Sequence, residues 1–333
     1  MADTLSFQNI LDHLLDSKKD IPHGHLQYYS DLDPKSLRLF LDIWSSVKPA
    51  RKLLLLDQLL ANLETDNIVS YIDIGLSLLD DEDGEVRARA IRLLAESDDP
   101  KLAGKLTDIL LNDADLAPRM EAANLLGEFI LLGELEKLPG NIQGKAEDAL
   151  ISIVRSDDNS TLRKRCIESL GYSSHTELEG LIESAFQRAD PTWVASALRA
   201  MGRSHDERWN EDVIGMLLND EPQIRFAAVE AAGELGIEDA GPILLQMLED
   251  EEEDDDVVAT AIWSISQIGG DDARIYLLNL IENTEDEVAV EFLEDALENL
   301  DFMEELNKFD LLSLDEDEIE ELDELEETDE DDS

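Results

Sequence analysis

The stretch Glu221–Gly236 reads EPQIRFAAVEAAGELG, and much of the chain can be aligned on it. It places an acidic residue four positions before Arg225 and small residues three and seven positions after it. Six further segments align with it, centred on Arg87, Arg119, Arg163, Val194, Val258 and Ala289. They recur at intervals of 31 to 33 residues, with one interval of 44. This register predicts an array of repeated helix pairs.

The position three residues after each reference residue is small in six of the seven segments: Ala90, Ala122, Cys166, Ala197, Ala228 and Ala261, with Phe292 in the last. A helix pair has an apolar face that it cannot bury alone, so successive pairs stack and share a core. We expect the small residues to let neighbouring helices approach closely. The acidic residue four positions before each reference residue is expected to cap a helix or to pair with an arginine of the adjacent repeat.

The order of acidic residue, Arg, Ala and Leu-Gly resembles HEAT repeats of the short bacterial type, called phycobilisome-lyase-like HEAT repeats. It is carried by Arg119, Ala122 and Leu126-Gly127, and by related residues over roughly 35–300. The resemblance implies an all-α, right-handed α-solenoid of about seven HEAT-like helix pairs. It also implies a structural ladder of stacked acidic and basic side chains: Asp83, Arg87, Asp115, Arg119, Arg163, Glu221 and Arg225. Since Val194, Val258 and Ala289 lack the arginine, the ladder is expected to be weaker in the C-terminal half.

Three segments are expected. Residues 1–34 form an N-terminal helical cap, residues 35–300 form the solenoid with an insertion near 128–144, and residues 301–333 form an acidic, disordered tail. Residues 310–333 hold 15 Asp or Glu and no Lys or Arg, and such a run repels itself. Four apolar residues in this run are also spaced as in an amphipathic helix that forms on binding: Leu314, Ile319, Leu322 and Leu325.

The formal net charge is −55, and −40 remains when residues 310–333 are left out. Such a surface repels nucleic-acid phosphate and anionic membranes, so we expect a basic protein partner and no direct nucleic-acid binding. We expect no membrane insertion, because no apolar run approaches the roughly 20 residues that span a bilayer. The sequence begins without the features of a signal peptide, which predicts a cytoplasmic location.

Acidic residues cluster where the turns of the helix pairs are expected, and turns of stacked pairs align along one edge. Two clusters are candidates for partner binding: Asp80, Asp81, Glu82 and Asp83, and Glu251, Glu252, Glu253, Asp254, Asp255 and Asp256. They could form a docking edge for a basic segment, or they could cap helices and solvate the surface. Trp193 and Trp263 are expected on second helices, either as aromatic anchors for a partner or as core residues.

No catalytic, cofactor-binding or metal-ligating residues are predicted, and no cofactor is expected. The chain has no P-loop, dinucleotide fingerprint, nucleophile elbow or zinc cluster. The run Asp81-Glu82-Asp83-Gly84 does not fit an EF-hand loop, although weak cation binding stays open. No His is followed by Glu, which argues against a di-iron hydroxylase built from such repeats.

These features favour a non-enzymatic protein-interaction scaffold or adaptor that holds a basic partner on its concave face or its acidic turn edge. Two alternatives stay open. One is a bilin lyase or a helper subunit of a lyase, which only the family resemblance suggests. The other is an acidic chaperone or inhibitor that mimics nucleic acid and occupies a basic site.

Overall fold

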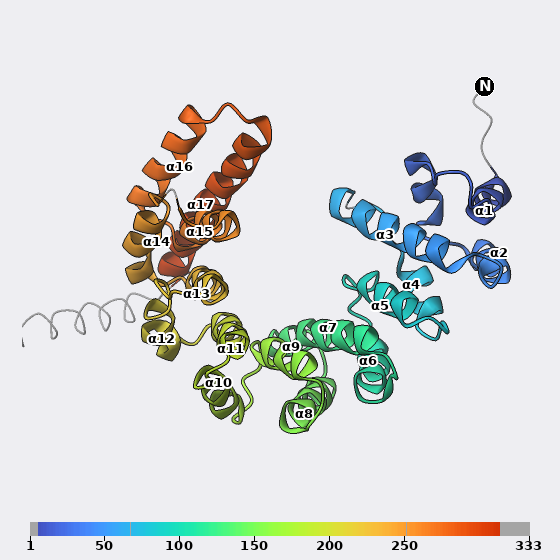
Figure 1. Cartoon of the computed structure of the whole chain (residues 1–333), viewed down its shortest axis with the longest axis horizontal. Coiled ribbons are helices and arrows are strands. Elements are labelled where there is room, and N and C mark those ends of the chain that lie inside the picture. The colour runs from blue at the N-terminus through green and yellow to red at the C-terminus, as the bar shows by residue number, and fades with distance from the viewer. Residues whose placement is uncertain (1–5, 67, 251, 314–333) are drawn as a thin grey trace, which may run out of the picture. The chain divides into compact units, whose positions relative to one another are not determined.

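The computed structural model describes residues 6–66, 68–250 and 252–313, and every regular element in these ranges is a helix (Figure 1). The chain divides into two compact units, unit 1 (Met1–Leu181) and unit 2 (Ile182–Ser333). No helix in the described ranges is long and apolar enough to cross a membrane.

Unit 1 opens with two short elements, α1 (Phe7–Leu15) and the 3₁₀-helix η1 (His23–Tyr29). Tyr29 is buried and packs edge-on against Phe7 and Phe40, with ring centroids 6.0 Å apart in both pairs. Arg51, also buried, donates hydrogen bonds to backbone carbonyls at the C-terminal end of α1. A cation suits this end of a helix, where carbonyls lack partners within the helix. These contacts fasten the first helix to the array.

The remaining helices of unit 1 form pairs, and we call the two members of each pair its first and second helix, in chain order. They are α2 (Pro34–Trp44) with α3 (Pro49–Thr65), α4 (Ile72–Leu78) with α5 (Gly84–Arg92), α6 (Pro100–Asn112) with α7 (Leu116–Glu134), and α8 (Gly140–Arg155) with α9 (Ser160–Leu170). The second helices pack in series, α3 on α5, α5 on α7 and α7 on α9. Helix α10 (Leu178–Phe186) runs across the boundary between the units.

Unit 2 repeats this arrangement. It contains α11 (Pro191–Ser204), α12 (Asn210–Ile214), α13 (Pro222–Glu234), α14 (Gly241–Met247), α15 (Asp255–Ile268), α16 (Asp271–Asn283) and α17 (Glu287–Ser313). The second helices α11, α13, α15 and α17 pack side by side. Helix α17 extends beyond residue 301, where the sequence predicts the start of the tail, and residues 314–333 lie outside the described residues.

The small residues of the repeat register lie at the centre of the packing. Three of them fall in unit 1 and three in unit 2, and each has an exposed fraction of 0%: Ala90, Ala122, Cys166, Ala197, Ala228 and Ala261. Burial raises the pKa of the Cys166 thiol, as expected for a thiol that acts as a small apolar side chain. The predicted all-α solenoid is confirmed in each unit.

The insertion near residues 128–144 adds length to helices. It falls where α7 ends at Glu134 and α8 begins at Gly140, and these helices have 19 and 16 residues. In contrast, α4 and α5 have 7 and 9 residues. The extra residues therefore lengthen two successive helices of unit 1, α7 of one pair and α8 of the next.

Candidate functional site

Cations on the second helices pair with carboxylates in the turns that join the two helices of the next pair. We call this row of ion pairs the ladder. Its rungs in unit 1 are Lys52–Asp81, Arg87–Asp113 and Arg119–Asp158. Unit 2 contains the rung Arg225–Glu253. Each rung joins a second helix to the turn of the next pair, so the ladder links neighbouring pairs.

The first rung is the most buried. Lys52 Nζ lies 3.0 Å from Asp81 Oδ2, and the two side chains are 8% and 5% exposed. The indole Nε1 of Trp44 donates to the same oxygen at 2.6 Å, and the backbone N–H of Asp83 donates to Asp81 Oδ1. Burial alone would raise the pKa of Asp81, but these hydrogen bonds together lower it below its ordinary value.

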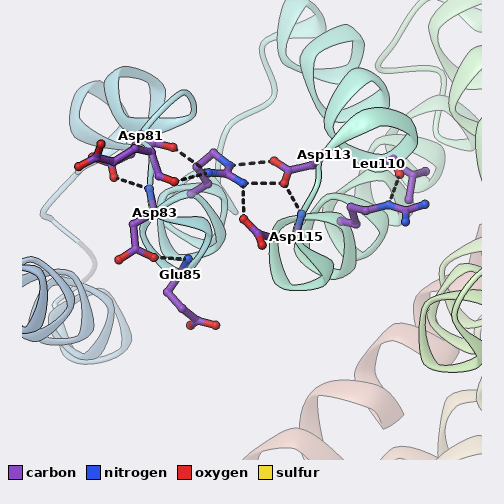
Figure 2. A network of polar contacts seen from close by, with 9 residues as sticks. Asp81, Asp83, Glu85, Leu110, Asp113 and Asp115 are labelled. Carbon is purple, nitrogen blue, oxygen red and sulfur yellow. Dashed lines mark hydrogen bonds and ion pairs between the residues drawn. The ribbon is translucent and has the colours of Figure 1, made fainter.

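Arg87 connects two successive turns. Its Nε and Nη2 donate to both oxygens of Asp113 at 2.8 and 2.6 Å, and Nη2 also donates to Asp115 (Figure 2). Its Nη1 donates to the backbone oxygen of Asp81 at 2.8 Å. A guanidinium presents its donors in a planar fork that fits one carboxylate bidentately. The Asp113 side chain is only 8% exposed, and the bonds from Arg87 hold the pKa of its carboxyl below the ordinary value despite the loss of solvent.

The other predicted arginines follow the same pattern. Arg119 donates to the carbonyl of Leu110 and, with both Nη atoms, to Asp158. Arg225 holds both oxygens of Glu253 and also the carbonyl of Asn219. Arg163 donates from Nε to the carbonyl of Val154. Each arginine thus closes the turn of its own pair, and Arg87, Arg119 and Arg225 also bind a carboxylate of the next pair.

The carboxylates of the ladder agree only in part with those that the sequence favours, since Asp115 binds Arg87 whereas Asp83 and Glu221 lie at helix N-caps. Asp83 is the N-cap of α5 and accepts from the N–H of Glu85, and Asp254 caps α15 in the same way. Asp115 accepts from Arg87, while Glu221 is an N-cap residue without a side-chain cap bond. Where Asn159 and Asp254 cap their helices, the arginine binds the carboxylate one position earlier, Asp158 or Glu253. Arg87 binds both Asp115 and Asp113, which lies two positions earlier.

Lys52 is the member of the ladder that the repeat register does not reveal. The residue three positions after it is Leu55, so the small residue that marks the other repeats is absent. Its position 35 residues before Arg87, close to one repeat length, is the signal that could have identified it.

Carboxylates outside the ladder remain exposed along the same turns. In the first cluster, Glu82 is exposed and the exposed Asp80 pairs with Lys105. In the second cluster, three exposed carboxylates lie beside the buried Glu253, namely Glu252, Asp255 and Asp256. Glu251 lies outside the described residues. In each of these two turns one carboxylate belongs to the ladder and several of its neighbours are exposed to solvent.

The two tryptophans differ in exposure. Trp193 on α11 is 4% exposed, and the guanidinium of Arg188 lies 3.7 Å from its ring centre. Trp263 on α15 is 39% exposed. Trp193 therefore packs within unit 2, and Trp263 is the one of the pair whose ring is open to a partner.

Glu234, at the end of α13, is a carboxylate outside the ladder. Its Oε2 is buried and has no hydrogen-bond partner among the described residues, and it occupies the space above Gly202 on α11. Burial and then the nearby Glu230 raise its pKa to about 7, while Arg203 and Arg199 on α11 oppose the shift. Glu234 therefore titrates near neutral pH.

We expect Glu234→Gln to stabilise the protein by about 3 kcal/mol at pH 8 and to have little effect at pH 4.5. The folded pKa lies above the ordinary value of 4.5, so the folded state binds more protons than the unfolded state between these values. The free energy of unfolding thus falls as pH rises from about 4.5 to about 7, and glutamine removes that loss. Urea denaturation at both pH values measures it, with the exposed Glu238→Gln as the control. Equal effects of Glu234→Gln at both pH values would contradict the assignment.

The described residues contain no cluster of potential metal ligands. Groups of three or more His, Cys, Asp or Glu side chains placed to hold a metal ion are absent from residues 6–66, 68–250 and 252–306. The residues with shifted pKa values in the turns are explained by the ladder.

Stacked helix pairs joined by a cation–carboxylate ladder define an α-solenoid. The family model for HEAT repeats matches residues 72–142, 178–255 and 211–298, which together exceed half of the chain. The chain belongs to the HEAT-repeat family, whose solenoids typically serve as scaffolds for protein interactions.

A HEAT repeat-containing taxis protein of Halobacterium salinarum is 27% identical over 150 residues, which cover 41% of this chain and 36% of that protein. The chain thus matches about a third of that relative's length. Among solved structures, importin beta is 11% identical with a TM-score of 0.42, covering 88% of this chain and 46% of importin beta. Human deoxyhypusine hydroxylase is 14% identical with a TM-score of 0.33, covering 79% of this chain and 95% of the enzyme.

Proposed function

We propose that this chain is a non-enzymatic interaction scaffold whose protein partner presents a basic surface to the acidic turns. The observation that carries the proposal is that the carboxylates of the turns fall into two groups, one paired within the ladder and one exposed. Cations of the chain neutralise the buried carboxylates Asp81, Asp113 and Glu253, while neighbouring carboxylates stay exposed. Among them, Glu82, Glu252, Asp255 and Asp256 take no part in the ladder, so they are available to a partner.

The turn of unit 2 that precedes α15 is the strongest candidate within this edge. Glu252, Asp255 and Asp256 are exposed together, and Asp255 and Asp256 also lie in the first turn of a helix. Exposed charges of one sign attract a partner of opposite charge at long range and raise its association rate. Trp263, further along the same helix, is 39% exposed and offers an apolar contact.

The experiment is affinity capture from the native cell extract at low salt and at about 0.5 M salt. We expect basic proteins that are released by salt, because exposed charges are screened within about 10 Å at 0.1 M salt. The triple variant Glu252→Gln, Asp255→Asn and Asp256→Asn should weaken binding of the captured protein about 10-fold, at about 0.5 kcal/mol per charge. Isothermal titration calorimetry with the purified partner measures this change.

The matched control removes three exposed carboxylates of the same unit from α17, with Glu291→Gln, Glu294→Gln and Glu298→Gln. This variant has the same net charge as the first and should change the affinity less than 2-fold. Equal losses in both variants would mean that only the net charge matters. Neutral or acidic partners that resist salt would contradict the proposal.

The bilin-lyase alternative rests on the resemblance to a named repeat type, and no described side chain adds support to it. In the other alternative, the chain mimics nucleic acid and likewise binds a basic partner. Competition between this chain and DNA or RNA for the captured partner distinguishes such an inhibitor from a scaffold.

A further inference from the structure

A groove of about 940 Å³ lies within unit 2, between the first helices α14 and α16. The turn from α15 to α16 leaves room for it, because Gly269 and Gly270 line the groove and place no side chain there. Their φ angles of 82° and 97° lie in the left-handed region that favours glycine. The floor is apolar, with Leu245 from α14, Ile268 from α15 and Met303 from α17. Each of these three side chains is partly exposed, so the floor is open to a partner.

The charged residues that line this groove are all acidic. Glu238 precedes α14, Glu249 follows it, and Asp271 and Asp272 begin α16. All four are exposed, and none of them forms an ion pair among the described residues. The fifth carboxylate of the lining, Glu304, pairs with an arginine of α16. No Lys, Arg or His is among the described residues that line the groove, so the rim attracts cations.

This acidic rim is a property of the site and not of every groove in the chain. A groove of about 620 Å³ lies within unit 1 between the first helices α6 and α8. It is lined by the exposed Lys101 and Lys145 and by one carboxylate, Asp148. The two grooves occupy equivalent places in the repeat, yet the charges around them differ. The excess of Asp and Glu in the chain therefore does not by itself explain the rim of the α14–α16 groove.

We propose that the α14–α16 groove binds a basic amphipathic helix of the partner protein. Its apolar side chains would lie on Leu245, Ile268 and Met303, and its Lys or Arg side chains would pair with the carboxylates of the rim. An acidic helix would be repelled by this rim, and a basic segment without apolar residues would leave the floor uncovered. The inference rests on the proposed function, because the helix belongs to a basic partner, and it adds which kind of segment that partner presents.

The length of the groove fits a short helix. Residues 241–249 of the groove wall extend about 12 Å at 1.5 Å per residue, which equals roughly two helical turns of 5.4 Å. Amphipathic helices bind such grooves through apolar side chains three and four positions apart. Glu249 also lies three residues before Glu252 in the sequence, so the groove leads toward the acidic turn that precedes α15. A single basic segment of the partner can therefore contact both the turn and the groove.

Fluorescence anisotropy with a labelled synthetic peptide tests the groove in the full-length protein. The probe is a helical peptide of about 12 residues, with leucines on one face and lysines on the other. One control peptide has serine in place of leucine and keeps the charge, and a second has glutamate in place of lysine and keeps the leucines. We expect the probe to bind at least about 10-fold more tightly than either control. Equal affinity of the probe and the serine peptide would overturn the proposal.

Variants that fill a groove separate apolar docking from general attraction between charges. Gly241 lines the α14–α16 groove, and a Cβ built on it would meet no atom within 4 Å. Gly241→Leu should weaken binding of the probe at least about 10-fold, whereas Gly241→Ala should change it less than about 2-fold. Gly104→Leu fills the groove of unit 1 without changing the net charge, and as the matched control it should leave the affinity unchanged. Circular dichroism checks that the variants are folded, and an unchanged affinity in folded Gly241→Leu would overturn the proposal.

Charge variants test the rim. Glu249→Gln with Asp272→Asn should weaken the probe about 5-fold, because two of the exposed carboxylates are lost. The matched control, Glu291→Gln with Glu294→Gln, removes two exposed carboxylates from α17 outside the groove and should change the affinity less than about 2-fold. Equal losses in both variants would assign the attraction to the net charge and overturn the proposal.

The captured partner distinguishes this inference from the proposed function. If its affinity falls with the triple variant Glu252→Gln, Asp255→Asn and Asp256→Asn but not with Gly241→Leu, the scaffold proposal holds and the groove is excluded. If its affinity falls with both, the groove and the acidic turn bind the same partner, as we expect. If it falls with Gly241→Leu alone, the groove is supported and the assignment of the partner to the acidic turn is overturned.

Discussion

Replacement of Asp81 by alanine is expected to lower the free energy of unfolding by about 3–4 kcal/mol. The carboxylate is 5% exposed and accepts from Lys52, from the indole of Trp44 and from the backbone N–H of Asp83. Removal of one partner from a buried ion pair costs about 3–5 kcal/mol, because the remaining charge is left buried without compensation. The orphaned indole N–H adds to this cost.

Urea denaturation followed by circular dichroism measures the change, and the adjacent residue supplies the control. Asp80 is 85% exposed and pairs with Lys105 on the surface, so Asp80→Ala should cost less than about 0.5 kcal/mol. Asp81→Asn should fall between the two, since its amide oxygen still accepts hydrogen bonds but does not neutralise Lys52. A loss below 1 kcal/mol for Asp81→Ala would mean that the ladder contributes little to stability.

The repeat register could be predicted from the sequence because helix packing imposes it on every pair. A position that is small in six of seven repeats must face a close neighbour, and all six of those side chains are fully buried. The same regularity predicts the arginines of the ladder. Arg87, Arg119 and Arg225 recur at fixed positions and each binds a carboxylate of the next pair.

The carboxylates of the ladder could not be fixed in the same way. The turns are rich in Asp and Glu, and sequence spacing alone does not separate a residue that caps its own helix from one that faces the previous pair. At Asp83 the cap forms, whereas at Asp115, the equivalent N-cap position of the next pair, the side chain accepts from Arg87 instead. That choice depends on backbone direction within a turn of a few residues, which composition does not encode.

The sequence also does not predict which of the two tryptophan side chains is buried. Trp193 and Trp263 both lie on the second helix of a pair, α11 and α15, yet Trp193 is 4% exposed and Trp263 is 39% exposed. Arg188 covers the ring of Trp193, and this contact depends on the turn that precedes α11. The partner-binding residues stay a prediction, because exposure shows which side chains are available and not what binds them.

Gly202→Leu is expected to destabilise the protein by about 3 kcal/mol, since α11 and α13 touch at this glycine. A Cβ on Gly202 would lie 2.9 Å from Ala231 Cα, and a backbone atom of a packed helix cannot move aside as the end of a side chain can. Gly233 meets Ser264 Cα on the following helix at the same distance, so the close approach recurs from one pair to the next. Overpacking typically costs 1–3 kcal/mol, and the rigid neighbour places this site at the upper end.

Gly104→Leu is the matched control for this prediction, because Gly104 also lies inside a helix but has no atom within 4 Å of a built Cβ. Leucine has a higher helix propensity than glycine, so this variant should be stabilised by about 0.5–1 kcal/mol. Urea midpoints of the two variants should therefore move in opposite directions from that of the unchanged protein. If Gly202→Leu also stabilised the protein, the glycines of the register would reflect helix flexibility, and the small residues would not be what sets the spacing of the array.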